Sequence, residues 1–287
     1  MTTPNGRTPR TALVIGSGSV KCAAAIGLLN VLQREGIPLD MVVGCSGGSI
    51  YAATIALGLP ADTIAAMTAQ LWTREITSRR RRRAWLQIML PGLFGFDEHF
   101  GMVDDTLVMK RLRAAFGGQS FADTVIPLSI TATDFNDGAQ VVLTSGSLVD
   151  AIRGSIAIPY IFAPYPVGDH LLVDGYLSDP MPVGVAIKEG ADVIIAMGFD
   201  SPYQSRVNSL FRYTFQISSI MSNNLFNANY AFHNLAHHSE VIPIIPEFEE
   251  RIRLFDTQKI PQIIAAGERA AEEQLPYLRR LYEEARP

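Results

Sequence analysis

Short apolar runs alternate with helical patterns along the first 60 residues of the chain. Thr11 to Ile15 and Met41 to Val43 are short apolar runs that lead into glycine and serine, as is typical of buried strands. Lys21 to Glu35 and Ile50 to Leu57 predict helices that end at glycine and proline. The order strand, helix, strand, helix indicates a βαβ unit and therefore a parallel sheet.

The rest of the chain adds strands and then becomes mainly helical. Strand-like segments are Pro127 to Thr133, Gln140 to Leu143, Leu171 to Val173 and the continuous apolar run from Asp192 to Met197. The last of these is typical of a central parallel strand, and Val183 to Lys188 before it predicts a helix. Residues 207–285 are expected to be mainly helical and to end in a charged amphipathic helix from Ile263 to Glu284.

Composition and charge describe one globular domain. The chain has 287 residues, of which 48% are hydrophobic, and a formal net charge of −4, which argues against a nucleic-acid partner. We expect a disordered polar tail at 1–10 and one domain at 11–285. The tail has no apolar signal region, so we expect a cytoplasmic protein, with peripheral contact to the inner membrane an open option. Cys22 and Cys45 are too few for a disulfide framework.

A nucleophile motif follows the second predicted strand. Gly44-Cys45-Ser46-Gly47-Gly48 fits the pattern G-x-S-x-G, in which a tight turn between strand and helix exposes the serine hydroxyl. Gly44 and Gly48 would leave room for the turn, and the helix N-terminus beneath it favours negative charge. A chance match is the alternative, although about 0.1 such matches are expected in a chain of this length. The flanking strand and helix therefore favour Ser46 as a nucleophile.

A second loop can supply hydrogen-bond donors to a developing oxyanion. Gly16, Ser17, Gly18, Ser19 and Lys21 lie where the first strand leads into the first helix. The backbone of Gly18 and Ser19 could donate to the carbonyl oxygen of a reacting ester, and Lys21 could orient the loop or meet a headgroup. A tight structural turn is the alternative. A dinucleotide-binding loop would need a third glycine, and Asp40 precedes the second strand instead of ending it.

The general base is expected at Asp174. This residue follows the apolar run 171–173 and precedes Gly175, so we expect it at the carboxyl end of a parallel strand, where α/β enzymes place reactive groups. A plain Asp-Gly turn is the alternative. A serine–histidine–acid triad would instead use one of the late histidines, His233, His237 or His238, which lie in a polar, helical stretch and resemble surface residues.

Taken together, these motifs resemble those of the patatin-like phospholipase family, in its bacterial single-domain form, from Thr11 to about Leu281. The marks are the loop 17–21, the elbow 44–48, Thr133-Asp134 with Gly138, the stretch Arg153 to Pro159 and Asp174-Gly175 followed by Pro182. The resemblance implies a three-layer α/β/α fold with a mainly parallel central sheet. It also implies a Ser46–Asp174 dyad without histidine, an acyl-serine intermediate, acyl esters of lipids as substrates, and no metal or other cofactor.

The chain departs from the family pattern at three places. Ser17 and Ser19 replace two glycines of the loop, Tyr176 stands where glycine or alanine is usual, and Ala25 replaces a histidine. A catalytically weak, lipid-binding relative is therefore an alternative to an active hydrolase, because losing one oxyanion donor costs roughly 10²–10³ in rate.

Residues 78–101 form a basic and apolar segment, which we expect to be an insertion in the domain. Arg79, Arg80, Arg81, Arg82 and Arg83 are followed closely by Trp85 and further apolar residues. This composition is typical of a segment that contacts an anionic membrane surface, although a solvated arginine face is the alternative. The aromatic stretch 210–232 could pack in the core, cover an acyl-chain pocket or form a subunit contact. The sequence leaves the oligomeric state open, with a homodimer among the options.

Overall fold

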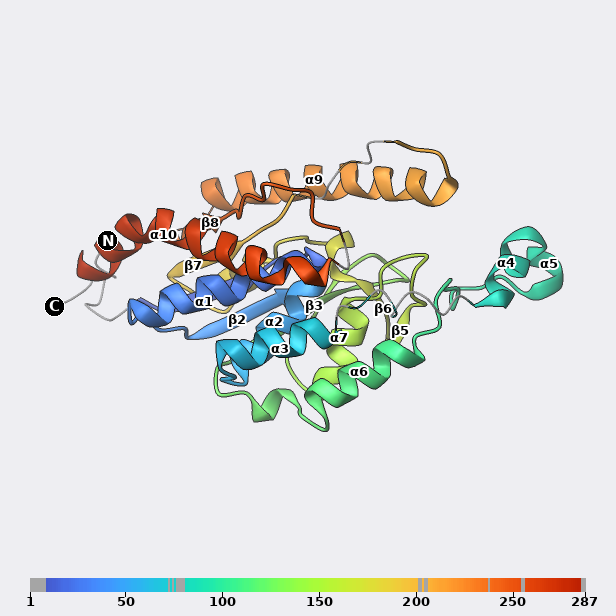
Figure 1. Ribbon diagram of the computed structural model, residues 1–287, viewed down its shortest axis with the longest axis horizontal. Coiled ribbons are helices and arrows are strands. Elements are labelled where there is room, and N and C mark those ends of the chain that lie inside the picture. Colours follow the sequence, from blue (N-terminus) through green and yellow to red (C-terminus); the bar gives the residue numbers. More distant parts are fainter. Residues whose placement is uncertain are drawn as a thin grey trace.

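One sheet of eight strands forms the centre of the described molecule, and helices cover both of its faces (Figure 1). The computed structural model describes residues 9–71, 73, 75, 81–200, 203, 206–236, 238–253 and 256–284, without the side chains of 82, 210, 211, 234–236 and 284. The strands are β1 (Thr11–Ile15), β2 (Met41–Cys45), β3 (Leu128–Asp134), β4 (Gln140–Leu143), β5 (Tyr165–Val167), β6 (His170–Asp174), β7 (Val193–Met197) and β8 (Glu240–Ile244). They follow the order β5-β6-β3-β2-β1-β7-β8, and β4 pairs with β3.

The helices connect these strands and account for much of the remaining chain. The α-helices are α1 (Ala24–Arg34), α2 (Gly47–Ala56), α3 (Ala61–Leu71), α4 (Arg82–Met89), α5 (Pro91–Phe94), α6 (Thr106–Phe116), α7 (Leu148–Ser155), α8 (Val183–Lys188), α9 (Leu210–Ala236) and α10 (Ile260–Glu284). Short 3₁₀ helices are η1 (Ser19–Ala23), η3 (Phe121–Asp123), η4 (Gly175–Leu177) and η5 (Thr257–Lys259). The predicted three-layer α/β/α fold with a mainly parallel sheet is confirmed.

Successive residues of the central strands point into two different cores. Leu13 and Ile15 of β1 belong to the larger core, which α1, α2, α3, α6, α7 and α10 close. Ala12 and Val14, their neighbours, belong to a smaller core under α8, onto which Phe226 of α9 packs. Strands that are buried on both faces carry apolar residues at successive positions, which explains the continuous apolar runs in the sequence.

The parallel strands bring their carboxyl ends to one edge of the sheet. Ile15 at the end of β1 lies opposite Gly44 of β2 and Met197 of β7, and Met197 lies opposite Ile244 of β8. The loops that follow these strands therefore share the same edge, which is where open α/β sheets place their binding sites.

Two strands meet end to end along one edge of β3. β2 pairs with β3 as far as the couple Cys45–Thr131, and β6 pairs antiparallel with β3 from the next residue, in the couple Asp174–Ala132. β4 pairs with Ile130–Thr133, and because a strand has only two edges, β2 and β6 must share the other one. The last residues of β2 and β6 consequently lie beside each other.

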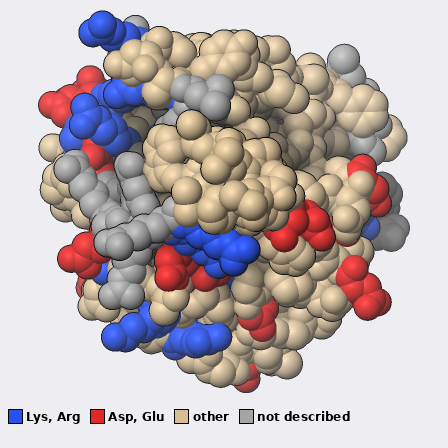
Figure 2. All heavy atoms as spheres, turned by 90° about the vertical axis from the view of Figure 1, so that its right-hand side faces the viewer, with Lys and Arg blue, Asp and Glu red and all other residues tan. Residues whose placement is uncertain are grey.

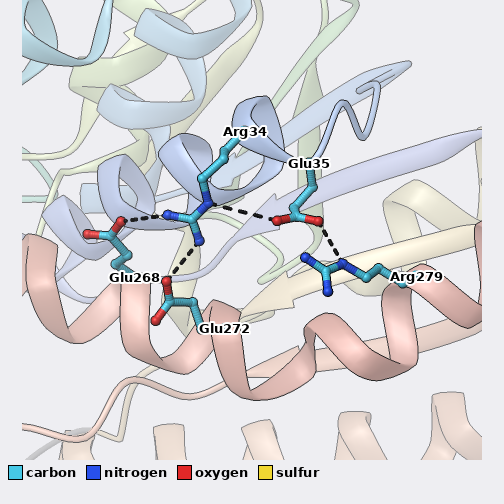
Figure 3. A network of polar contacts seen from close by, with 5 residues as sticks. All are labelled: Arg34, Glu35, Glu268, Glu272 and Arg279. Atoms are coloured by element: carbon cyan, nitrogen blue, oxygen red, sulfur yellow. Dashed lines mark hydrogen bonds and ion pairs between the residues drawn. The ribbon is translucent and has the colours of Figure 1, made fainter.

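Charged side chains connect the first and last helices across the surface (Figure 3). Arg34 of α1 forms ion pairs with Glu268 (3.4 Å) and Glu272 (2.8 Å) of α10, and Glu35 pairs with Arg279 (2.7 Å). Half of the Arg34 side chain is exposed, so water screens these ion pairs and they contribute little to stability. The network aligns two helices whose apolar faces supply most of the packing energy.

Several expectations about the elements need correction. Asp174 does end a strand, but β6 runs antiparallel to β3, so the expectation of a parallel strand was wrong. The predicted helix at 50–57 begins at Gly47, directly after Ser46. β8 lies between the two long helices of the region 207–285, where no strand was expected. Residues 1–8 of the expected tail lie outside the described residues.

Candidate active site

Ser46 occupies a strained turn between β2 and α2. Its backbone has φ 53° and ψ −127°, a conformation that residues with a side chain rarely adopt. A side chain at Gly48 would lie 2.6 Å from the Gly16 carbonyl oxygen, and one at Gly44 would lie 2.5 Å from the Ala52 methyl group. The turn therefore requires glycine at both positions, as the G-x-S-x-G pattern predicts.

The Ser46 hydroxyl donates a hydrogen bond to Asp174. The distance from Ser46 Oγ to Asp174 Oδ2 is 2.7 Å, and both side chains are buried. The Ser46 amide in turn donates to Ser155 Oγ (2.8 Å), and that hydroxyl donates to the Thr131 carbonyl oxygen (2.7 Å). Ser155 thus ties the strained turn to β3, and the serine hydroxyl is held against the carboxylate.

Asp174 is held by its backbone while its side chain remains aimed at Ser46. Its amide donates to the Ala157 carbonyl (3.1 Å), and Thr133 Oγ1 donates to its carbonyl (3.0 Å). Complete burial raises the pKa of Asp174 to about 7, although hydrogen bonds from Ser46 and from the Tyr176 amide lower it. A carboxyl with a pKa near neutrality can accept a proton and release it again under physiological conditions.

The loop between β1 and η1 holds two amides in hydrogen bonds and leaves a third without a partner in the described part of the chain. The Gly16 amide donates to the Met197 carbonyl and the Ser17 amide to the Pro180 carbonyl, so both are committed to the scaffold. The Gly18 amide has no hydrogen-bond partner within the described residues. A side chain at Gly18 would meet the Phe199 ring at 2.5 Å, which explains why glycine is retained here.

Ser19 brings this loop against the nucleophile turn. Its φ is 55°, and a side chain at Gly47, the residue after Ser46, would lie 2.7 Å from the Ser19 amide nitrogen. Ser19, at the beginning of η1, therefore lies directly against the residue that follows Ser46. Backbone amides in this position can stabilise negative charge on an oxygen bound at Ser46.

Lys21 anchors the loop that follows β7. Its Nζ donates to the Asp200 carbonyl (2.7 Å) and lies 5.7 Å from the centre of the Phe199 ring. Burial lowers the pKa of Lys21, while the nearby Asp200 raises it. These contacts connect the glycine loop to the segment after β7, and the position of Lys21 on the cavity wall also allows contact with a headgroup.

A cavity of ≈ 210 Å³ opens at Ser46 and Asp174. Its wall combines four large apolar residues, several serines and three cationic residues. The apolar group consists of Ile158, Phe199, Phe215 and Ile252, and the cations are Lys21, Arg251 and Arg253. Such a lining can hold an apolar chain with a polar or anionic group at one end.

The late histidines do not line this cavity where the structure describes them. His233 is half-buried on α9, where its ring packs against Gly184 of α8, so the expectation that it lies on the surface was wrong. His238 is exposed, and His237 lies outside the described residues. Asp40 accepts from the Thr11 amide (2.7 Å) at the opposite end of the strands, away from the glycine loop.

The expected membrane residues lie away from the site. Arg81, Arg83 and Trp85 are exposed on or beside α4, whereas Arg79, Arg80 and the side chain of Arg82 lie outside the described residues. No helix in the described part of the chain is long and apolar enough to cross a bilayer. Likewise, the described residues contain no group of three His, Cys, Asp or Glu side chains that could hold a metal ion.

Sequence reasoning did not assign a role to Ser155. The residue stands in the stretch Arg153 to Pro159, which was noted as a family mark, but nothing local shows that its hydroxyl reaches the Ser46 amide. Glycine is required at position 175, because a side chain there would lie 2.6 Å from the Thr131 carbonyl oxygen. Ser155 and Gly175 both lie against Thr131 of β3 and do not line the cavity.

Comparisons with known proteins find a matching family and several sequence relatives. A family described as "Patatin-like phospholipase" matches residues 13–187, which include Ser46, Asp174 and the loop 16–21. An uncharacterized NTE family protein of Mycobacterium tuberculosis is 30% identical over 192 residues, which cover 67% of this chain and 49% of that protein. Neuropathy target esterase sws of Drosophila melanogaster is 30% identical over 191 residues, which cover 66% of this chain and 13% of that protein.

A solved structure shares the fold at low sequence identity. VipD from Legionella pneumophila superimposes with a TM-score of 0.51 and 13% identity, covering 96% of this chain and 69% of that one. The present chain spans about half the length of the mycobacterial relative and a much smaller part of the fly protein.

Proposed function

This chain belongs to the patatin-like phospholipase family, and on that premise we propose that it is a serine lipid acyl hydrolase with a Ser46–Asp174 dyad. The observation that carries the proposal is the 2.7 Å hydrogen bond from Ser46 Oγ to a fully buried carboxylate. A hydroxyl needs a base before it can attack an ester, and the Asp174 carboxylate is in direct contact with it.

The proposed reaction has two halves. Ser46 Oγ attacks the ester carbonyl carbon while its proton passes to Asp174, and the amides of Gly18 and Ser19 stabilise the oxyanion. The intermediate then collapses, the alcohol leaves with the proton from Asp174, and an acyl-serine remains. Water then attacks this ester while one of its protons passes to Asp174, and the fatty acid is released as Asp174 returns that proton to Ser46.

The cavity supports a substrate that has an acyl chain and an anionic headgroup. Phe199, Phe215 and Ile252 provide an apolar wall, whereas the exposed guanidinium groups of Arg251 and Arg253 lie at its rim. Neither arginine has an ion-pair partner within the described residues, so both can meet a phosphate. We therefore place phospholipids and lysophospholipids ahead of neutral glycerides.

A lipid panel with mass analysis of the products tests the proposal. Release of free fatty acid from phospholipids supports it, and transfer of the acyl group to another alcohol would show an acyltransferase instead. Replacing His233, His237 and His238 together by Ala separates the dyad from a histidine triad. Retained turnover in this variant removes the triad, whereas complete loss in a folded variant would overturn the dyad.

The pH dependence of turnover should report the Asp174 carboxyl. Since the base must be ionised and the pKa of Asp174 is about 7, we expect kcat/KM to rise with pH and to level off above about 7. Below that pH the rate should fall about tenfold per pH unit. The measurement uses a dissolved p-nitrophenyl ester, with the uncatalysed hydrolysis subtracted. A rate that is constant from pH 5 to 8 would contradict the assignment.

A further inference from the structure

A helical hairpin projects from the main body of the molecule at the end of the sheet where the cavity opens. We call residues 81–101 the arm, which contains α4 and α5 and projects beyond the main body (Figure 1). Gln87 Nε2 donates to the Gly95 carbonyl (2.8 Å), and Arg83 Nη2 donates to the Phe94 carbonyl (3.3 Å). The two helices are therefore hydrogen-bonded to each other.

The base of the arm is tied to the wall of the cavity. The amides of Met102 and Val103 donate to the carbonyls of Tyr160 (3.0 Å) and Ile161 (2.9 Å). These acceptors follow Ile158, which lines the cavity, by two and three residues. Whatever the arm binds is consequently brought to the end of the sheet where Ser46 lies.

The tip of the arm is apolar and unusually exposed. Trp85 is 56% exposed, Met89 69% and Leu93 75%, and Leu86, Ile88, Leu90 and Phe96 are exposed as well. Residues 84–96 contain no Asp, Glu, Lys or Arg. Exposed apolar surface of this extent marks an interaction site, because single scattered apolar residues, not contiguous ones, are normal on a protein surface.

Positive charge precedes this tip in the sequence. Five arginines precede it at positions 79–83, and Asp97 and Glu98 follow it, so that residues 79–101 carry a formal net charge of +3. Arg81 and Arg83 are exposed. Figure 2 faces this side of the molecule and shows an uncharged protrusion toward the viewer, with both Lys or Arg and Asp or Glu side chains along its lower edge.

We propose that the arm docks the protein on an anionic lipid bilayer, with its tip among the acyl chains and its arginines at the headgroups. The order of an apolar tip and a cationic base matches the order of acyl layer and anionic headgroup in a membrane. A protein groove usually accepts one stripe of a helix, whereas α4 exposes Trp85, Leu86, Ile88 and Met89 over a wide arc. The delivery of substrate to the cavity rests on the proposed lipid hydrolase function, but the docking itself does not.

Vesicle sedimentation tests the docking. The wild-type chain should sediment with phosphatidylcholine vesicles that contain about one third phosphatidylglycerol, and Met89→Ser with Leu93→Ser should bind at least about tenfold more weakly. Arg81→Gln with Arg83→Gln should weaken binding to the anionic vesicles about ten- to thirtyfold and change binding to pure phosphatidylcholine little.

Matched variants control for general loss of apolar surface or charge. Val125 is 73% exposed and precedes β3, at the end of the sheet opposite Ser46, so Val125→Ser should bind vesicles like the wild type. Lys110 and Lys188 are exposed on α6 and α8, and their joint replacement by Gln removes the same charge as the arginine pair. Equal losses in control and arm variants would overturn the proposal.

Fluorescence and turnover separate docking from catalysis. Trp85 should shift to shorter wavelength on vesicles in a Trp72→Phe chain, in which it is the remaining tryptophan. All arm variants should hydrolyse a dissolved short-chain ester at the wild-type rate.

The outcomes distinguish failure of the docking from failure of the proposed enzyme function. Vesicle binding without any ester turnover would reject the hydrolase function and leave the docking proposal intact. Unchanged vesicle binding in the arm variants would reject the docking, as would a dimer that the same variants dissociate in sedimentation velocity.

Discussion

Replacing Ser46 by Ala should lower kcat for a p-nitrophenyl ester by about 10⁴-fold or more, because the acyl-serine intermediate can no longer form. The substitution removes one buried hydroxyl and leaves Asp174 without the hydrogen bond at 2.7 Å. The site keeps its oxyanion donors and its cavity, so a small residual rate above that of water is expected. Turnover of the purified variant measures the loss directly.

Covalent labelling supplies an independent measurement. A fluorophosphonate probe should modify the wild-type chain at Ser46 and leave Ser46→Ala unlabelled, with peptide mass analysis to locate the adduct. The matched control is Ser49→Ala, since Ser49 lies in the same turn, is buried and donates to the Ser46 carbonyl (2.6 Å). Labelling that persists in folded Ser46→Ala, or that moves to another serine, would remove Ser46 as the nucleophile.

The turn at Ser46 was predictable because its constraints are local in the sequence. A strand, a turn with φ 53° at Ser46 and a following helix all lie within residues 41–56, and small residues on both sides are required wherever this turn occurs. The parallel order of β1 and β2 also followed from one helix between them. Local patterns therefore gave the strand, the turn at Ser46 and the helix that follows it.

The partner of Ser46 depends on pairing that no local pattern shows. Asp174 reaches Ser46 because β6 takes over the edge of β3 at the residue where β2 stops. That arrangement requires an antiparallel strand whose register is set 40 residues away, at Ala132 and Thr133. The sequence indicated an acid after a strand, but the direction of the strand could only come from the assembled sheet.

The two strands that were missed share a physical reason. β5 contains Pro166 and β8 contains Pro243, and proline within a run argues against a central strand because it lacks an N–H for the ladder. Both strands lie at the two ends of the order β5-β6-β3-β2-β1-β7-β8, where one side needs no partner. In this sheet, proline within an apolar run indicates an edge strand.

Replacing Asp174 by Asn should lower kcat by about 10³–10⁴-fold while leaving the fold intact. Asparagine has the same shape and can still accept a hydrogen bond from Ser46, but its amide cannot take up a proton. Asp179→Asn is the matched control, since burial raises the pKa of Asp179 to about 6 and its carboxylate accepts from Asn229 (3.1 Å) and not from Ser46. This control should retain turnover within about tenfold of the wild type.

The same substitution should change how stability depends on pH. The pKa of Asp174 is about 7 in the folded chain and about 3.8 when unfolded, so the folded state binds more protons between these values. The wild type therefore loses stability as pH rises from about 4 to 7, on the order of a few kcal/mol, and Asp174→Asn lacks this loss. The Tm of the variant minus that of the wild type should increase from pH 5 to pH 8 in thermal scans, with the contribution of Asp179 cancelling in the difference. A difference that stays constant over this range would show that Asp174 is already ionised at pH 5, and a carboxylate with such an ordinary pKa would be too weak a base to activate Ser46.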